Sequence, residues 1–421
     1  VASLDAFGTF SRPEIAAMGA LVAYLDLTQR GRLPLLRPPL RESSAGTMQI
    51  DAATRRNLEL TQALSGGREG SLLAAIDRTV TAGGARLLER RISSPSCDLP
   101  VIHDRLEAVR FLVEQPSQAE ALRDALRRVP DIDRALSRLA LDRGGPRDLA
   151  AIRAGLEQAD RIGGVLADAP PLLAQAAAAL FGHGDLVGLL QTALVAEPPL
   201  FARDGGFVAE GYDSDLDETR RLRDEGRSVT AVLQAVYVAL TGVQSPQIKD
   251  HNVLGAFVET TATHAEKMLA PPLSQTFIHR QTTANQVRFT TVPLSALETR
   301  ILNAGNHALE IETGHFAALR TAVLAQSGPI GAAARALAEF DLAAGLADIA
   351  RAENWVEPTV DSSHAFVIRA GRHPVVERAL RRLGGGAFVP NDCALTEAQV
   401  PAIWLLTGPN MAGKSTFLRQ N

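Results

Sequence analysis

The sequence predicts a mainly α-helical protein whose last residues begin an α/β domain. Three observations support this prediction. Helical periodicity runs through most of residues 11–350, two long heptad-spaced helices flank a β-rich insert, and an apolar run leads into a glycine-rich loop at residues 408–415. We interpret these patterns as a helical core, a long antiparallel coiled-coil arm carrying a small β-rich tip, and the start of an α/β domain.

The composition is that of a globular protein with several domains. The chain has 421 residues, a net charge of -4, 46% hydrophobic residues and 21% charged residues, which excludes a disordered chain and a small basic protein that coats nucleic acid. Its two cysteines, Cys97 and Cys393, exclude a disulfide-rich fold and a cysteine-based zinc site, and they fit a reducing cytosol. We expect Cys393 to be buried. No apolar run approaches the roughly 18 residues of a membrane span.

The N-terminal half predicts a series of packed helices. Residues 11–14 (SRPE) form a capping box and open a helix that runs to Gln29. Asp51 is an N-cap residue for a helix over residues 53–62, and Asp98 is an N-cap residue for another. Further helices are predicted near residues 117–128, 131–141, 146–167, 170–181 and 184–195.

The first helix of the predicted arm follows a Pro- and Gly-rich break at residues 197–212. It runs from Ser214 to Gly242, where a glycine ends the pattern. Its apolar stripe has heptad spacing and comprises Leu222, Gly226, Val229, Leu233, Val236 and Leu240. Residues 253–261 and 286–292 are rich in β-branched side chains and predict strands.

The second helix of the predicted arm starts at Pro293 and continues to about Gln326. One heptad stripe comprises Leu294, Leu297, Ile301, Ala304, Ala308 and Ile311. A second stripe comprises Leu302, Leu309, Phe316 and Val323. Because both stripes flank one β-rich insert, an arm with a tip is favoured over the alternative of two ordinary core helices.

The motif that carries chemistry lies at residues 408–415, which fit the pattern G-x-x-x-x-G-K-[ST]. A strand predicted at residues 402–406 precedes it, and a helix beginning near Thr416 follows it, as the motif requires. In this pattern the glycines expose backbone N–H groups to phosphate oxygens, Lys414 reaches the β- and γ-phosphates, and Ser415 offers a hydroxyl to Mg²⁺. The motif predicts binding of a nucleoside triphosphate; a glycine turn that caps a helix is the structural alternative.

The β-rich insert also has a modest positive bias. Only three of the 43 Lys and Arg residues are lysines, and Lys249 and Lys267 lie in the insert together with Arg280 and Arg288. These four cations are candidates for contacts with nucleic-acid phosphates. An ordinary mixed surface is the alternative.

A separate short segment, residues 372–374 (RHP), has two interpretations: a functional loop or an ordinary exit from a strand.

Several segments together resemble the MutS family of DNA mismatch-repair ATPases. Residues 407–416 (TGPNMAGKST) resemble the family's nucleotide loop, and residues 51–59 (DAATRRNLE) resemble its core signature. Residues 371–377 (GRHPVVE) resemble the entry to its ATPase domain, and residues 280–282 (RQT) with Asn285 and Arg288 resemble its clamp. The resemblance covers essentially the whole chain, with the motifs in the family's order.

The resemblance implies a domain plan. Residues 1–10 would end a connector domain, residues 11–199 and 311–354 would form the lever and core, residues 200–310 would form the clamp, and residues 355–421 would begin the P-loop ATPase domain. It also implies ATP and Mg²⁺ as cofactors, with Ser415 on the metal and Phe388 stacked on adenine. The implied nucleotide-binding residues are Phe388, Gly408, Pro409, Asn410, Met411, Ala412, Gly413, Lys414, Ser415 and Thr416.

The resemblance further implies a cytoplasmic, nucleoid-associated homodimer that closes around double-stranded DNA and engages a MutL-type partner. The family's mismatch-reading domain and its Walker B acid have no counterpart in this chain, so we expect a fragment with no catalytic residues of its own and no ATP turnover. Two alternatives remain: a MutS-related scaffold that clamps DNA without reading mismatches, and an unrelated P-loop kinase or GTPase with a helical extension.

Overall fold

The computed structural model divides the chain into two compact units. The first comprises Val1–Gly144, Ala151–Gly188 and Val323–Asn421, and the second comprises Gly145–Ala150 and Leu189–Ala322. The structure describes residues 10–29, 34–36, 38, 39, 41, 46–165, 168–243, 247–251, 255–283, 285–397, 400–409 and 411–421. The connector end predicted before Phe10, the beginning of the strand predicted at residues 253–261, and Asn410 therefore lie outside the described residues. Within these ranges, no helix is both long and apolar enough to cross a membrane.

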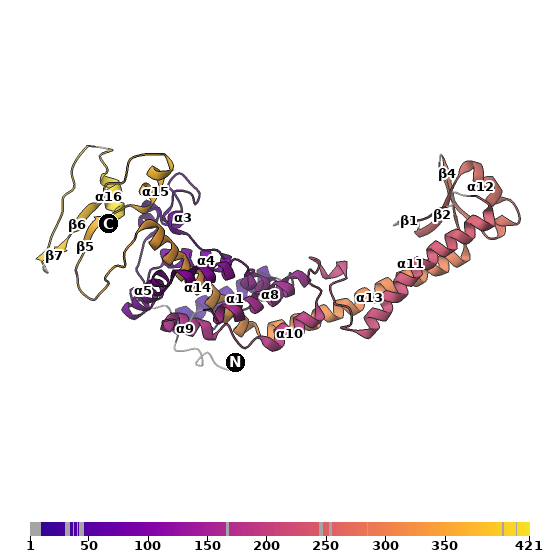
Figure 1. Ribbon diagram of the computed structural model, residues 1–421, viewed down its shortest axis with the longest axis horizontal. Helices are drawn as coiled ribbons and strands as arrows, with labels where there is room; N and C mark the ends of the chain where they lie inside the picture. Colours follow the sequence, from indigo (N-terminus) through magenta and orange to yellow (C-terminus); the bar gives the residue numbers. More distant parts are fainter. Residues whose placement is uncertain are drawn as a thin grey trace. The chain divides into compact units, whose positions relative to one another are not determined.

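The first unit is built around α14 (Ser327–Glu353), which packs against α4, α5, α6, α7 and α9 (Figure 1). Small buried residues such as Ala336, Ala343 and Ala347 let these neighbours approach closely. The helices that precede α11 in the chain are α1 (Arg12–Thr28), α2 (Ala52–Asn57), α3 (Leu72–Ile76), α4 (Ala82–Ser93), α5 (Leu99–Glu114), α6 (Pro116–Leu126), α7 (Ile132–Ala140), α8 (Pro146–Gly163), α9 (Pro171–Ala178) and α10 (Gly184–Ala193). Of these, α8 and α10 each have residues in both units.

Most of the predicted helices are confirmed, but one of them is too long. The Ser11 N–H donates to the Glu14 carboxylate (2.6 Å) in the predicted capping box, and the Thr54 N–H donates to Asp51 (2.8 Å). The helix predicted over residues 53–62 is wrong in length because α2 ends at Asn57. Glu59 has a φ of 52°, a left-handed conformation that a right-handed helix cannot continue through.

A buried carboxylate fixes the start of α4 to α14. Asp341 is fully buried and accepts hydrogen bonds from the N–H groups of Val80 (2.9 Å) and Thr81 (2.7 Å) and from the Thr81 hydroxyl (2.6 Å). Burial raises the pKa of Asp341 even though these donors favour its charged form. Thr81 also caps α4 by accepting a hydrogen bond from the Gly84 N–H (3.0 Å).

The second unit contains two long helices joined through a small sheet (Figure 1). α11 (Ser214–Thr241) leads into the sheet and α13 (Val292–Ala325) leaves it. The strands pair antiparallel in the order β1-β2-β4-β3. Their bounds, with the helix that follows β2, are β1 (Gln247–His251), β2 (Gly255–Thr261), α12 (Ala262–Leu269), β3 (Ile278–Thr282) and β4 (Gln286–Thr290). The two predicted strands correspond to β2 and β4, whereas the sequence did not predict β1 or β3.

The stripe predicted for α11 is wrong in its orientation. Val229 and Val236 are 44% and 50% exposed, and Leu222 and Leu240 are similarly exposed. Tyr237 and Thr241, each one residue after a stripe position, are buried instead, as are Leu216 and Thr219 near the start of the helix. Leu233 of the stripe is partly buried against the cluster around Tyr237.

The stripes predicted for α13 are largely confirmed. Leu294, Leu297 and Ala308 of the first stripe are buried, as are Phe316 and Val323 of the second. Leu302, in contrast, is exposed. One face of α13 is therefore apolar over most of the helix, whereas four residues of the α11 stripe (Leu222, Val229, Val236 and Leu240) are exposed.

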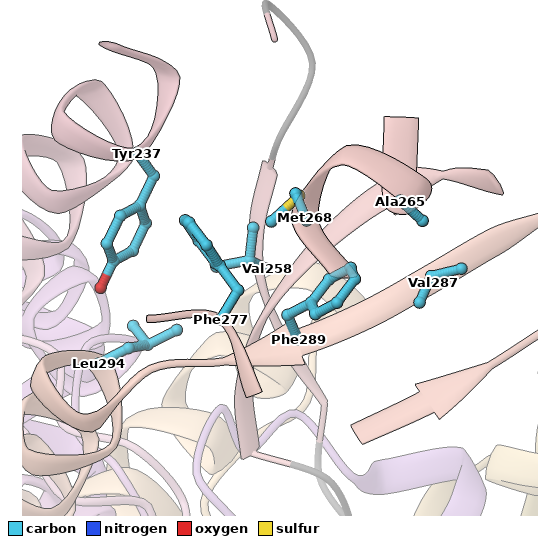
Figure 2. Packing of buried hydrophobic residues seen from close by; sticks show 8 residues of the cluster. All are labelled: Tyr237, Val258, Ala265, Met268, Phe277, Val287, Phe289 and Leu294. Atoms are coloured by element: carbon cyan, nitrogen blue, oxygen red, sulfur yellow. The ribbon is translucent and has the colours of Figure 1, made fainter. Parts of the chain in front are cut away.

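The sheet of β1, β2, β4 and β3 is called the tip sheet below. Its buried core joins the strands to both long helices (Figure 2). Phe277 lies edge-to-face with Tyr237 (centroids 5.3 Å apart) and with Phe289 (6.4 Å). The Tyr237 hydroxyl forms a hydrogen bond with the Thr291 hydroxyl, so the buried phenol is satisfied. The same cluster includes Val258, Ala265, Met268, Val287 and Leu294.

At the other end of the helix pair, a buried carboxylate binds three segments. Glu312 of α13 is 2% exposed, forms an ion pair with Arg220 of α11, and accepts a hydrogen bond from the Gly206 N–H (2.6 Å). Gly206 has a φ of 74°, which favours glycine at this position. The turn before α11, α11 itself and α13 therefore meet at one side chain.

The C-terminal part of the first unit contains short strands and helices. β5 (Val367–Gly371) pairs antiparallel with β6 (Asn391–Ala394), and β7 (Thr396–Glu397) pairs with β8 (Val400–Pro401). α15 (Pro374–Arg382) lies between β5 and β6 in the chain. The predicted burial of Cys393 is confirmed.

The strand predicted at residues 402–406 is wrong. The segment has no strand pairing, and the side chains of Ile403 and Leu405 are 98% and 87% exposed. A strand needs a hydrogen-bonded neighbour, and the described residues provide none at this place. The helix predicted after the glycine-rich loop is confirmed as α16 (Lys414–Gln420).

Candidate functional site

The glycine-rich loop has the backbone conformation that the motif predicts. Gly408 and Gly413 have φ values of 147° and 85°, and Met411 has a φ of 69°. These positive angles reverse the chain between the extended segment and α16, and two of the three positions are glycines, which adopt them without strain. The loop ends at Gly413, and Lys414 is the first residue of α16.

Lys414 folds back over the loop. Its ammonium group donates hydrogen bonds to the carbonyl oxygens of Gly408 and Pro409, the second at 2.9 Å. Both acceptors are neutral, so the positive charge has no carboxylate partner among these contacts. An anion that enters the loop would offer the ammonium a stronger acceptor than either carbonyl.

A cavity of about 410 Å³ lies beside the loop and brings distant residues together. Its walls include Phe388 together with Lys414 and Thr416, so an aromatic ring and a cation line the same space. The residues that line the cavity are Phe388, Val389, Asn391, Leu406, Thr407, Ala412, Gly413, Lys414, Thr416 and Phe417. The sequence did not predict that Val389, Asn391 and Leu406 line the cavity, because no local pattern marks them. It also did not predict that the rings of Trp404 and Phe417 stack, with centroids 6.4 Å apart.

These residues fit a nucleotide in chemical terms. Phe388 offers a flat surface to a base, and Lys414 offers a charge to phosphates. Ser415 is exposed at the start of α16 rather than in the cavity wall, and its hydroxyl is a suitable ligand for Mg²⁺. Among the described residues there is no group of three His, Cys, Asp or Glu that could hold a metal ion.

The loop at residues 372–374 has a structural role. The Arg372 guanidinium donates to the carbonyl oxygens of Glu353 (2.8 Å) and Asn354 (2.9 Å), which closes the end of α14. His373 is buried, and this burial lowers its pKa, with a further contribution from the nearby Arg419. His373 is therefore neutral near pH 7, and the loop anchors α15 to α14.

In the tip sheet, two of the four predicted DNA-contacting residues neutralise a buried acid. Glu259 is 5% exposed and pairs with Lys249 (2.6 Å) and Arg288 (3.2 Å). The hydrogen bond from Lys249 lowers the pKa of Glu259, and Arg288 adds to this effect. Arg288 also lies 4.6 Å from the centroid of the Phe257 ring. Both cations therefore stabilise the sheet.

The other two predicted contacts differ from each other. Lys267 donates to the Thr241 carbonyl (2.7 Å) and so satisfies the end of α11. Arg280 lies in β3, whose residues are all exposed, and the pairing with β4 shifts register between His279 and Gln281. A bulge of this kind turns the extra residue away from the ladder. The described residues provide no ion-pair partner for Arg280, so its charge is available to a ligand.

Comparison with known proteins decides the family. Residues 53–347 match the family model described as MutS domain III. This chain belongs to the MutS family. It is 72% identical to the DNA mismatch repair protein MutS of Cereibacter sphaeroides, 71% identical to that of Paracoccus denitrificans and 66% identical to that of Ruegeria pomeroyi. Each match covers 100% of this chain and 48% of the relative, so the chain spans about half the length of these MutS proteins.

The family predicted from the motifs is therefore confirmed, and the alternative of an unrelated P-loop kinase or GTPase is excluded. The fold expected of the matched region, mainly helical with a small antiparallel sheet, is also confirmed. The predicted domain boundaries and the nucleotide-binding and DNA-binding residues stay predictions.

Proposed function

We propose that this chain forms the lever, the clamp and the nucleotide loop of an ATP-dependent DNA mismatch-repair protein. In this proposal α11 and α13 form the coiled-coil arm of the clamp, and residues 355–421 begin the ATPase domain. The observation that carries the nucleotide part is the cavity shared by Phe388 and Lys414, which the sequence separates by 26 residues. It supports the binding of ATP with Mg²⁺, with Asn410 and Ser415 included in the site by family resemblance.

The cavity supports nucleotide binding better than hydrolysis. Among the described residues that line it, none is Asp or Glu, and the amide of Asn391 is hydrogen-bonded to the Val389 carbonyl. Phosphoryl transfer to water needs groups that hold the metal and orient the attacking water, and these are commonly acidic or amide side chains. We therefore propose that the chain binds ATP without turning it over.

A binding assay with a fluorescent ATP analogue tests the nucleotide part. Lys414→Ala should weaken binding at least about tenfold, because it removes the charge on the phosphates. Phe388→Ala should weaken binding of ATP while leaving binding of inorganic triphosphate unchanged, since the ring would contact only the base. Lys267→Ala is the matched control, because Lys267 binds the Thr241 carbonyl and is remote from the loop in sequence. Equal binding by the chain and by Lys414→Ala would contradict the proposal.

The DNA part of the proposal rests on the exposed Arg280 at the tip. The Phe side chains in the described part of the tip (Phe257, Phe277 and Phe289) are buried and offer no surface on which bases could stack, so contacts from Arg280 to phosphates are expected instead of contacts to bases. Binding of duplex DNA by this chain should therefore depend on salt and be indifferent to mismatches. Homodimerisation, a MutL-type partner and a cytoplasmic location belong to the same proposal.

A further inference from the structure

The loop at residues 59–73 contacts α16, the helix that follows the glycine-rich loop. The loop spans residues 59–73 and is closed at its base, because the Leu72 N–H donates to the Glu59 carbonyl and the Leu73 N–H donates to the Leu60 carbonyl, both at 2.9 Å. Glu59 adopts its left-handed conformation at this base. Its backbone is therefore fixed to the start of α3.

The side chain of Glu59 connects this loop to α16. One carboxylate oxygen accepts a hydrogen bond from the Leu64 N–H (2.7 Å), and the other pairs with the Arg419 guanidinium (2.5 Å). The two side chains of the ion pair are only 21% and 31% exposed. Partial burial reduces screening by water and salt, so this pair is stronger than an ordinary surface ion pair.

A second ion pair joins the same loop to α15 and provides a contrast. Glu69 pairs with Arg382, but their side chains are 79% and 58% exposed. Exposed pairs of this kind contribute little to stability. The two glutamates thus lie in one loop, and each pairs with an arginine of the C-terminal segment, but only Glu59 reaches the helix that begins with Lys414.

α16 needs external contacts to hold its position. It has seven residues, too few to be stable as an isolated helix. Arg419 lies five residues after Lys414, which places the two backbones about 7.5 Å apart along the helix axis. A restraint on Arg419 therefore restrains the start of the helix and the loop before it.

We propose that Glu59 is a positioning residue for the nucleotide loop: through Arg419 it fixes α16, and with it Lys414, against the helical core. This inference rests on the proposed function for its biological meaning, since the loop it positions is the one assigned to ATP. By reciprocity, a ligand that shifts α16 changes the Glu59–Arg419 pair and hence the loop at residues 59–73.

Hydrogen–deuterium exchange on the 421-residue chain without nucleotide tests the restraint directly. In Glu59→Gln the amides of residues 411–418 should exchange about three- to tenfold faster, because a partly buried ion pair is lost. The amides of α5 and α6 should be unchanged. Glu69→Gln, the same substitution in the same loop, should leave residues 411–418 unchanged. The exchanged pair, Glu59→Arg with Arg419→Glu, should restore slow exchange at least in part.

The outcomes separate the inference from the proposed function. Unchanged exchange at residues 411–418 in Glu59→Gln, or the same increase in Glu69→Gln, would overturn the inference. Faster exchange throughout α5 and α6 would show a general loss of stability and would also overturn it. If Lys414→Ala binds the fluorescent ATP analogue as well as the unmodified chain does, the proposed function fails, while the exchange data still decide whether Glu59 positions the loop.

Discussion

Substitution of Arg280 should weaken DNA binding without affecting the fold, whereas substitution of Arg288 should do the reverse. Arg280 lies at the bulge of β3, has an exposed side chain and has no ion-pair partner among the described residues. Arg288 is paired with Glu259 and with Gln281 (3.0 Å). Because Arg288 already compensates the charge of a buried acid, few counterions should be released from it when DNA binds. Arg280→Ala should therefore reduce the salt dependence of DNA binding, whereas Arg288→Ala should change it little.

The structure sets the size of the two effects. Loss of one phosphate contact lowers the steepness of log K against log salt by about 0.9. Raising the salt concentration from 50 to 200 mM should therefore weaken DNA binding by the Arg280→Ala variant about 3.5-fold less than it weakens DNA binding by the unmodified chain. Its free energy of unfolding should change by less than about 0.5 kcal/mol. Arg288→Ala should reduce that free energy by about 2 kcal/mol, since Glu259 keeps only Lys249 as a charged donor.

The assay is a titration of a fluorescent duplex at four salt concentrations, combined with chemical denaturation of each variant. Arg280→Lys is the control, because it keeps the charge and should keep the slope. A homoduplex and a G·T heteroduplex should give equal affinities. The reasoning would be refuted if Arg280→Ala left the slope unchanged, if Arg288→Ala changed the slope by about one without a loss of stability, or if the heteroduplex were clearly preferred.

Three further predictions concern stability. Asp341→Ala should reduce the free energy of unfolding of the first unit by about 3 kcal/mol, because it leaves the donors of Val80 and Thr81 unsatisfied; a loss below about 1 kcal/mol in denaturant would contradict this. Val229→Asp should change protease resistance of the helix pair little, since its side chain is exposed, whereas Leu294→Asp should make the pair readily cleaved. Stability near α15 should fall as the pH drops below about 6.5, because burial lowers the pKa of His373 in the folded state and protonation therefore favours unfolding. A pH series of thermal unfolding should show a smaller decrease for His373→Gln.

The sequence predicted those elements whose signals are local. Caps at Ser11 and Asp51, the apolar face of α13 and the glycine-rich loop depend on residues a few positions apart, and each is present in the structure. The early end of α2 depends on the conformation of Glu59, which no nearby glycine or proline announces.

Features that depend on distant residues were not predictable in this way. Which residues of α11 are buried depends on the sheet and helix residues that it contacts, and four residues of its apolar stripe are exposed. The pair between Glu59 and Arg419 joins residues 360 positions apart, and no periodicity encodes it. Phe388 was connected to the nucleotide loop only by family resemblance, because a single Phe after a glycine run has no intrinsic meaning.

The carboxylate of Glu312 has a mechanical consequence for the second unit. It holds α11, α13 and the turn at Gly206 at one point, while the tip sheet begins near Leu294 on the same helix. Glu312 and Leu294 are 18 positions apart, which corresponds to about 27 Å of α-helix, so a rotation of about 5° about Glu312 would displace the sheet by about 2 Å. A small change of angle at Glu312 would thus become a shift of the sheet comparable with the length of a hydrogen bond.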